Sequence, residues 1–478
     1  MGNIRNNFDI LILGNGAIGS LSAILLDNEF PELRIGLVGD PARNNSASVA
    51  AGAMCNVFAE VEEPYSKNQK LLQELSLQMG VEGTRGWLEL FSKYTQLAQA
   101  KTAEDTIVFL KENPSDFELK NYNSALSRSR EYGLGESLAS RHFNEFFSGA
   151  LIRPQDAFKI KGEFAFDTRL LFNFFDRKIQ DSHISIPANS VFEIDTDSNA
   201  VITENGVITY SRLVVALGAN TSKLLKDLGL PPMVQGVGSA FEISTKNIQD
   251  SSLPRNVVLR TVNRGGAQCG LHFLPRISGY YLGAGNYISN IGKSDHRLET
   301  LRYLFNAFEK EICGKKVSYL LEGNLVKGHR PRSIDAFPII GSISNAPNVF
   351  VATGTNRAGL TWAPYIVKFI QGWCRDSLIH APFDHLISPN RKILDFGEEE
   401  EAAMYYTESR LGAAIEHERI SSFSVELNVE RERLRVIAYQ LLAEVRRAIQ
   451  DPGAVPHPDH WAVILDDASL CFDLGIGR

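Results

Sequence analysis

The sequence predicts an α/β fold, and three features carry that prediction. A short apolar run at residues 10–13 is followed by a glycine-rich turn and then by apolar residues at helical spacing from 21 to 25. A second buried strand is indicated at 34–38, and a further apolar run at 212–217 ends in another glycine turn. Strands that alternate with helices are typical of a parallel sheet covered by helices.

Composition narrows the class of protein. The chain has 478 residues, of which 44% are hydrophobic and 22% charged, so it can bury a sizeable core in two or more domains. The 49 Lys+Arg residues against 56 Asp+Glu leave a formal charge of -7 without a long basic block. This balance argues against nucleic acid or an anionic membrane surface as the main partner. Small molecules are therefore the expected partners.

The cysteines indicate neither a disulfide framework nor a zinc site. They are scattered, odd in number and never in a CxxC pair: Cys55, Cys269, Cys313, Cys374 and Cys471. We therefore expect a reducing, cytoplasmic setting. We also expect no metal site, since the cluster of His457, Asp459 and His460 lies in a Pro-flanked loop. The apolar stretch 10–26 contains Asn15 and three glycines, so we expect neither a signal peptide nor a membrane span.

The N-terminal glycine turn has the sequence GNGAIG at residues 14–19. Its first glycine allows the turn, its second lets the backbone approach a pyrophosphate, and its third lets the helix pack on the strand. Amides at the helix start then hold the phosphate charge. The residues expected to contact it are Gly14, Gly16, Ala17, Ile18 and Gly19. Asp40, after the second strand, is expected to bind an adenosine ribose; its alternative is a solvated turn acid. This pattern alone does not separate NAD from FAD.

Two later segments extend the nucleotide-binding pattern. Residues 201–203 and 206–209 flank a Glu204-Asn205 turn, which predicts a β-hairpin ahead of the strand at 212–217. A third block runs from 323 to 360 and contains another strand and two glycine-rich turns. The cofactor-binding fold is therefore expected to be discontinuous in sequence.

With these motifs the sequence resembles the D-amino-acid oxidase and glycine oxidase family of FAD-dependent amine oxidoreductases, from about Asp9 to Trp373. Six segments carry the resemblance, in family order: GNGAIG (14–19), SASVAAG (46–52), VVALGAN (214–220), HFLPRISGYYLGAG (272–285), GHRPRSIDAFPIIG (328–341) and ATGTNRAGLTWAP (352–364). The resemblance implies a Rossmann-like FAD-binding domain built from residues 8–60, 160–228 and 324–380. It also implies a helical layer and an antiparallel-sheet substrate domain from 61–159 and 229–323. Residues 381–478 are left as a helical C-terminal extension.

The resemblance also assigns cofactor contacts. Beyond the N-terminal turn and Asp40, it implies contacts to FAD from Ser46, Ala47, Ser48, Gly52, Ala53, Met54, Val191, Ala216, Gly218, Gly328, Arg330, Gly354, Asn356, Arg357, Ala358, Gly359, Leu360 and Thr361. Asn220 departs from the family, which often has Trp there. Non-covalent FAD is expected, because no cysteine lies between Cys313 and Cys374.

Three residues are expected at the substrate. Arg330 offers a planar fork that matches a carboxylate in bidentate fashion; its alternative is a structural arginine paired with Asp335. Arg357 matches an arginine near the active site of the glycine oxidase subgroup, or is a charge at the rim. His272 stands where that subgroup tends to carry Tyr, and could donate to the carboxylate or accept the amine proton. Its alternative is a hydrogen-bonded sheet histidine.

The expected reaction is oxidation of an amine or amino acid by hydride transfer to the flavin, giving an imine that hydrolyses to an oxo acid. Oxygen or another acceptor would take the electrons, and the sequence does not separate oxidase from dehydrogenase. Alternatives are a 2-hydroxy acid or a biosynthetic intermediate as substrate, or a flavin-binding subunit of a larger complex.

The C-terminal extension carries two helix signals. An acidic run at 398–401 indicates a helix start, and apolar residues every three or four positions predict an amphipathic helix from Asn428 to Ile449. This helix either packs on its own chain or forms an interface with a partner protein or another subunit.

Overall fold

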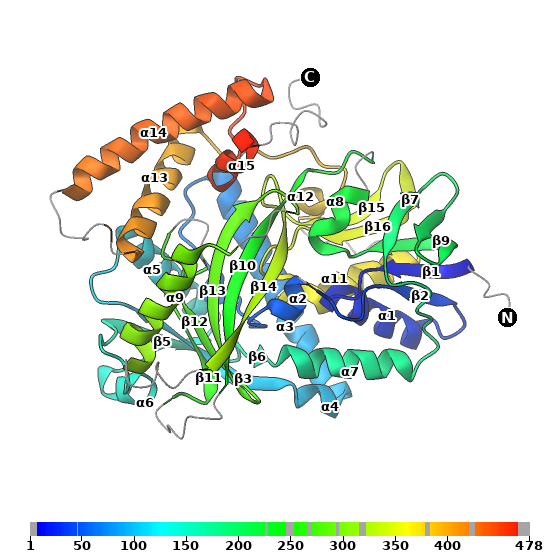
Figure 1. The fold of residues 1–478 in the computed structure, drawn as a ribbon, viewed down its shortest axis with the longest axis horizontal. Helices are drawn as coiled ribbons and strands as arrows, with labels where there is room; N and C mark the ends of the chain where they lie inside the picture. The colour runs from blue at the N-terminus through cyan, green and yellow to red at the C-terminus, as the bar shows by residue number, and fades with distance from the viewer. Residues whose placement is uncertain are drawn as a thin grey trace.

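Two β-sheets organise the chain in the computed structural model (Figure 1). The structure describes residues 7–44, 46–224, 228–244, 253–265, 269–292, 296–314, 322–377, 383–417, 419 and 426–466. Within these ranges the fold is mixed α/β, as the sequence predicts.

The first sheet has seven strands, with the core order β15-β16-β9-β1-β2. Its members are β1 (Asn7–Leu13), β2 (Ile35–Val38), β7 (Val191–Asp195), β8 (Ala200–Thr203), β9 (Gly206–Val215), β15 (Ile339–Ile343) and β16 (Ala346–Thr353). β1 pairs in parallel with β2 and β9, and β9 pairs in parallel with β16. Strands from the N-terminus, the middle and the last third of the chain therefore lie side by side.

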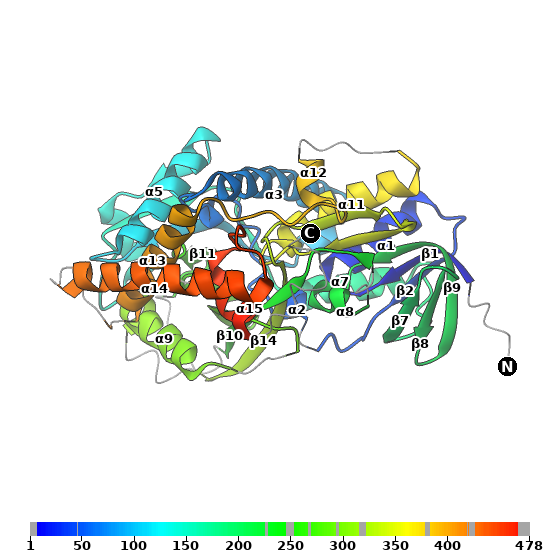
Figure 2. The ribbon, with the colours of Figure 1, turned by 90° about the horizontal axis from the view of Figure 1, so that it is seen from above.

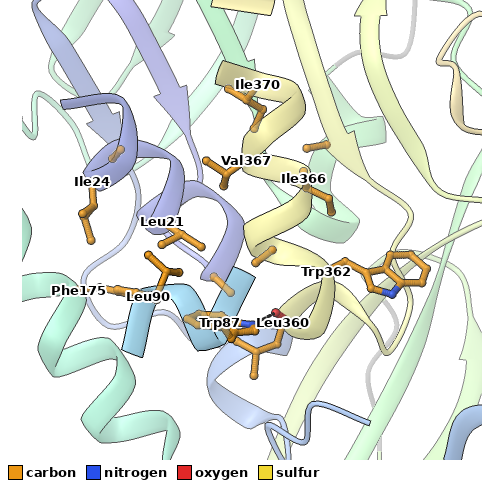
Figure 3. Packing of buried hydrophobic residues seen from close by; sticks show 14 of the residues in the cluster. Leu21, Ile24, Trp87, Leu90, Phe175, Leu360, Trp362, Ile366, Val367 and Ile370 are labelled. Carbon is orange, nitrogen blue, oxygen red and sulfur yellow. Dashed lines mark hydrogen bonds between the residues drawn. The ribbon is translucent and has the colours of Figure 1, made fainter. Parts of the chain in front are cut away.

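β1 is buried on both faces, which explains its unbroken apolar run. Ile10 and Ile12 face a layer of helices, while Leu11 and Leu13 face the opposite layer. The helices on the first face are α1 (Ala17–Glu29), α3 (Lys67–Lys93), α7 (Thr168–Gln180) and α11 (Gly359–Cys374), and Figure 3 shows how their apolar side chains meet.

β9 serves two purposes along its length. Its first part pairs antiparallel with β8, with Thr203 opposite Gly206, and this confirms the predicted hairpin. Its second part pairs with β1, bringing Val215 beside Leu13. The hairpin thus leads directly into the central strand that ends at the glycine turn of Gly218.

The second sheet has nine strands, with the order β14-β10-β13-β12-β11-β3-β5-β4 and β6 beside β3. Its strands are β3 (Lys101–Leu110), β4 (Gly135–Ser137), β5 (Asp156–Ile160), β6 (Ala165–Phe166), β10 (Met233–Ser244), β11 (Asn256–Arg260), β12 (His272–Arg276), β13 (Gly279–Ser289) and β14 (Glu322–Ser333). All pairs are antiparallel except β3 with β11. β14 carries residues 324–333 into this sheet, although the sequence groups them with the cofactor domain.

α3 fixes the start of α11 beside the seven-stranded sheet. A Cβ on Gly83 would lie 2.1 Å from the carbonyl oxygen of Thr361, so only glycine permits this approach. The carbonyl of Leu360 would ordinarily accept from the amide four residues on, but that residue is Pro364, which has no N–H. Trp87 Nε1 donates to this carbonyl instead, over 3.0 Å (Figure 3).

The C-terminal extension folds onto the end of the nine-stranded sheet (Figures 1 and 2). It contains α12 (Asp384–Ile387), α13 (Glu399–Glu416), α14 (Glu426–Ile449), the short helix η6 (Pro458–His460) and α15 (Trp461–Asp466). The acidic run does start a helix, with Glu398 and Glu401 forming a capping box. α14 begins two residues before the expected Asn428. Its buried side chains, among them Leu442 and Val445, join a cluster with Val234 of β10 and Ile334, which follows β14.

The remaining described elements complete the layers. They are α2 (Ala47–Ala50), η1 (Phe58–Glu60), α4 (Thr95–Ala98), α5 (Asp116–Glu131), η2 (Ser140–His142), α6 (Phe143–Phe147), η3 (Gly218–Asn220), α8 (Thr221–Leu224), α9 (Leu298–Phe308) and η5 (Glu309–Cys313). Among the described residues, none of the helices has both the length and the apolar character needed to cross a bilayer.

Candidate active site

A cavity of about 810 Å³ lies at the carboxyl ends of β1, β9 and β16. In open α/β sheets this edge is where ligands bind. Sixteen of the residues expected at the cofactor line it: Gly14, Gly16, Ala17, Ile18, Asp40, Ser46, Ala47, Ser48, Val191, Ala216, Gly218, Arg330, Asn356, Arg357, Gly359 and Leu360.

The other expected cofactor residues lie elsewhere. Gly52, Ala53, Met54, Gly354, Ala358 and Thr361 line a second, adjoining cavity. Gly19 packs beneath the turn, where a Cβ would lie 1.7 Å from the carbonyl oxygen of Gly14. Gly328 faces α2, where a Cβ would lie 2.8 Å from Cβ of Ala50. These two glycines allow close packing and do not line either cavity.

The N-terminal turn has the geometry of a phosphate cradle. Gly14 has φ +103°, and a Cβ there would lie 2.4 Å from the carbonyl oxygen of Ala216. The amide of Ala17 at the start of α1 donates to Ser48 Oγ over 3.1 Å, which brings α2 against the turn. Gly14, Gly16, Ala17 and Ile18 line the cavity at the start of α1, where a helix N-terminus favours an anionic ligand.

The lining also contains polar atoms that FAD would satisfy. Asn356 Oδ1 and His329 Nε2 are buried and have no hydrogen-bond partner in the described part of the chain. Both residues line the larger cavity, so His329 lies on the cofactor side and not in the second cavity. Size, glycine cradle and unpaired polar groups together fit a dinucleotide cofactor.

The second cavity has a volume of about 240 Å³ and meets the first at Ala51, Arg330, Thr355, Asn356, Arg357 and Leu360. All three residues expected at the substrate, Arg330, Arg357 and His272, line it. Arg330 and His272 come from β14 and β12 of the nine-stranded sheet. Arg357 comes from the turn between β16 of the seven-stranded sheet and α11, so the site lies where the two sheets meet.

Arg330 lies at the boundary of the two cavities. Its Nη1 donates to Asn286 Oδ1 over 2.7 Å, and the guanidinium lies against Gly238, where a Cβ would be 2.6 Å from Nη2. Among the described residues no carboxylate forms an ion pair with Arg330. The alternative partner, Asp335, is taken by Arg391 of the C-terminal extension, whose Nη2 donates over 2.8 Å.

Arg357 has a different environment, because two carboxylates hold it. Its Nη2 lies 3.0 Å from Glu60 Oε2 and 3.4 Å from Glu62 Oε1. Burial raises the pKa of Glu60, but Arg260 and Arg357 outweigh it and bring that pKa down to about 2. For Glu62 burial prevails, and its pKa is raised despite Arg357. Arg357 is therefore neutralised within the protein.

His272 is 4% exposed, and its Nε2 lies 2.6 Å from the carbonyl oxygen of Cys269. A carbonyl only accepts, so Nε2 carries the proton and the lone pair of the neutral ring sits on Nδ1. Burial, reinforced by Arg260, lowers the pKa of His272 well below its usual value, although Glu60 opposes this. His272 is thus a neutral acceptor and not a donor to a carboxylate.

Several residues of the second cavity were not singled out as site residues from sequence. Asn286 and the carboxylates Glu60 and Glu62 come from inside the family-like region, and their roles depend on arginines remote in sequence. Arg332 is two residues beyond Arg330 on β14. Tyr405, His457 and Asp459 come from the extension. From the sequence, the GHRPR motif points to Arg332, and His457 and Asp459 appear only as a cluster in a Pro-flanked loop.

In the part of the chain that is described, no group of three His, Cys, Asp or Glu side chains is arranged to hold a metal ion. Cys55, Cys269, Cys313 and Cys374 are free thiols, while Cys471 lies outside the described residues.

Comparison with protein families gives a match of residues 9–371 to the FAD dependent oxidoreductase family, DAO. The chain belongs to this family. The match spans both cavities' motifs and ends before the C-terminal extension. The protein is therefore an FAD-dependent oxidoreductase, and FAD is the cofactor that the larger cavity fits.

Solved structures share this fold at low sequence identity. Glycine oxidase from Geobacillus kaustophilus has a TM-score of 0.66 at 16% identity, over 81% of this chain and 100% of that one. Iminodiacetate oxidase from Chelativorans sp. BNC1 gives 0.62 at 18%, over 80% and 98%. L-amino acid deaminase from Proteus vulgaris gives 0.63 at 15%, over 82% and 99%. A search of curated proteins gave no match.

Proposed function

We propose that this protein oxidises the C–N bond of an amino acid or another amine that carries a carboxylate. The observation that carries the proposal is Arg330: a cation at the junction of the two cavities, held by the neutral Asn286 and, among the described residues, without a carboxylate partner. Arg330 is partly buried, and a partly buried cation without a counter-ion favours an anionic ligand. The names of the structural neighbours, glycine oxidase and L-amino acid deaminase, agree with an amino-acid substrate.

The cofactor contacts that we propose follow the lining of the larger cavity. Gly14, Gly16, Ala17 and Ile18 hold the pyrophosphate, Asp40 the adenosine ribose, and Val191 the adenine. The shared boundary at Asn356, Arg357 and Leu360 receives the flavin end. FAD is bound without a covalent link in this proposal, and no described cysteine lines the larger cavity.

Bound FAD supplies the redox chemistry, taking one hydrogen and its electron pair from the substrate carbon. The chain's own residues orient the substrate. Arg330 receives the carboxylate through two N–H groups, which fixes the carbon that loses hydrogen. Nδ1 of His272 accepts a hydrogen bond from the substrate N–H. Its lowered pKa means that it orients the neutral amine and does not retain a proton.

The reaction balances with water and one electron acceptor. The amine loses two electrons and two hydrogens to become an imine, and water converts the imine to an oxo acid with release of ammonia or a smaller amine. Oxygen or another acceptor then takes the two electrons.

The decisive experiment screens amines and amino acids for bleaching of the flavin absorbance under anaerobic conditions. We expect at least one carboxylate-bearing amine to bleach it. Arg330→Ala should weaken binding of that substrate by about 10- to 100-fold, the value of a charge-assisted hydrogen-bond pair. Arg169→Ala, an exposed arginine paired with Glu242, is the matched control. Unchanged affinity in Arg330→Ala would refute the anchor.

A 2-hydroxy acid remains the second candidate substrate, because the same carboxylate anchor would hold it. Release of ammonia or amine during turnover separates the two. The partner-recruiting role of the extension has less support, since the buried face of α14 is covered by α13 and α15 of the same chain.

We also propose the domain division given above, with one adjustment that sheet membership favours. β14 pairs along its whole length with β10, so the boundary at residue 323 would move to the end of β14 at Ser333.

A further inference from the structure

The C-terminal extension supplies part of the wall of the second cavity, called the substrate cavity from here on because the proposed function places the substrate there. Tyr405 on α13 and His457 and Asp459 around η6 line it, together with Arg332 of β14. All three extension residues lie beyond residue 371, where the family match ends. The extension is thus part of this site as well as part of the fold.

Arg330 and Arg332 form a pair on one face of β14. Residues two apart on a strand point to the same side, and their Cα atoms are about 6.8 Å apart. β10 pairs with both positions, with Gly236 opposite Arg330 and Val234 opposite Arg332. Both arginines line the substrate cavity. By position alone, either could bind a carboxylate.

Their partners distinguish the two arginines. Arg330 contacts the neutral Asn286, whereas Arg332 Nη2 lies 3.3 Å from Asp459 Oδ2 and 3.3 Å from His457 Nε2. Tyr405 donates its hydroxyl to the same Asp459 oxygen over 3.4 Å. Arg332 is 8% and Asp459 9% exposed. Moreover, Nε of Arg332 is buried without a partner in the described residues, so this guanidinium has donor capacity left.

We propose that Asp459 is a built-in carboxylate that occupies Arg332 and so restricts the site to substrates with one carboxylate. This rests on the proposed function, in which Arg330 binds the first carboxylate. A dicarboxylic amino acid such as aspartate or glutamate would bring its second carboxylate against Asp459. Like charges at such a buried place disfavour binding. Without the charge of Asp459, Arg332 would be a buried cation that a second carboxylate can neutralise.

The test compares Asp459→Asn with the wild-type holoenzyme. Asparagine keeps the shape and can still accept from Arg332, but it lacks the charge. The probes are butyrate and glutarate, titrated by their perturbation of the flavin spectrum. In the wild type we expect glutarate to bind no more tightly than butyrate. In Asp459→Asn we expect glutarate to gain about tenfold or more, the effect of one charge-assisted contact, while butyrate changes less than about threefold.

Two further variants assign the gain to Arg332. The double variant Arg332→Gln/Asp459→Asn should lose the new preference for glutarate, because no second cation remains. Asp451→Asn, the same change in the extension away from the cavity, should keep the wild-type ratio. If Asp459→Asn does not fold, Asp459→Ser carries the same expectation.

The inference is overturned if the wild type already prefers glutarate, or if Asp459→Asn leaves the ratio of the two affinities unchanged. It also falls if the gain survives loss of Arg332. Failure of the proposed function is seen separately: butyrate would then bind equally well to the wild type and to Arg330→Ala, or to neither, and no anchor for the first carboxylate would remain.

Discussion

The two cavities differ in how far apart in the sequence the interacting residues of their walls lie. The cofactor cavity is lined largely by short motifs that contribute backbone and small side chains, as at 14–18, 46–48 and 216–220. The substrate cavity is lined by long polar side chains whose partners lie far away, such as Arg330 with Asn286 and Arg332 with Asp459. Backbone shape is encoded locally, while the charge state of a side chain depends on the whole fold.

The largest expected effect is a loss of FAD binding. Gly14→Ala places a Cβ 2.4 Å from the carbonyl oxygen of Ala216 at φ +103°, so the turn must move. We expect protein purified with little or no FAD, and binding of added FAD weakened by at least about tenfold, measured from the flavin absorbance and a titration of the apoprotein.

Gly133→Ala is its control. Gly133 also has positive φ, at +71°, but no atom lies within 4 Å of a Cβ there. It carries the backbone strain without the collision and should keep normal FAD content. Equal loss of FAD in both variants would show that strain, and not the cradle, is being measured.

The next effect separates the two arginines at the cavity boundary. Arg357→Ala leaves the carboxylates of Glu60 and Glu62 facing each other without their shared cation. We expect a loss of about 2–3 kcal/mol in the free energy of unfolding, less than a fully buried pair because all three side chains keep some exposure. Denaturant unfolding of the holoenzyme measures it.

Arg330→Ala should have the opposite profile. It removes a contact to a neutral amide and leaves no charge unpaired, so stability should change by less than about 1 kcal/mol while ligand affinity falls. If both variants lose stability equally, the distinction between a neutralised and an available arginine is wrong.

The pH dependence of stability tests the environment of His272, the buried imidazole of the substrate cavity. Its folded pKa lies below the unfolded value near 6.5, so the unfolded chain binds more protons as pH falls. The stability from His272 is complete above pH 6.5 and is lost on acidification, by up to about 2 kcal/mol at pH 5. His272→Gln should therefore lose less stability than the wild type between pH 7.5 and 5, in melting temperatures across pH. Above pH 7 the difference between the two proteins should be constant, and a difference that grows there would contradict the assignment.

The smallest effect concerns the contact between α3 and the start of α11. Trp87→Phe leaves the carbonyl of Leu360 without its donor, which Pro364 cannot replace. We expect a loss of about 1–2 kcal/mol in unfolding free energy and somewhat weaker FAD binding. Trp373→Phe removes a partly exposed bond to Pro347 and should cost less. Equal costs would argue against the role given to Trp87.

The same contrast explains what could be predicted from sequence. The glycine turn, the hairpin around Glu204 and the acidic helix start follow from local rules, and the structure has all three. α14 already includes Glu426 and Leu427, so the helix runs past Asn428, which the local cap rule does not predict. Local propensity is a weak guide where tertiary contacts decide.

The substrate site could be located from sequence but not described. The motifs group Arg330, Arg357 and His272 at one site, and the structure has all three beside one cavity, yet the motifs do not show that Asp335 is held by Arg391. They also do not show that Cys269 fixes the proton position of His272. These partners are set by sheet register and by the extension, neither of which a motif contains.

Gly238, which touches no ligand in the proposal, has a consequence for stereochemistry. The guanidinium of Arg330 lies flat on its backbone, 2.6 Å from where a methyl group would be. A planar group held against a surface presents its edge in one direction. If that edge grips a carboxylate, it also decides which side of the neighbouring carbon is turned toward the coenzyme. The choice between mirror-image substrates would then depend on the glycine at position 238, which lies on the strand next to that of Arg330.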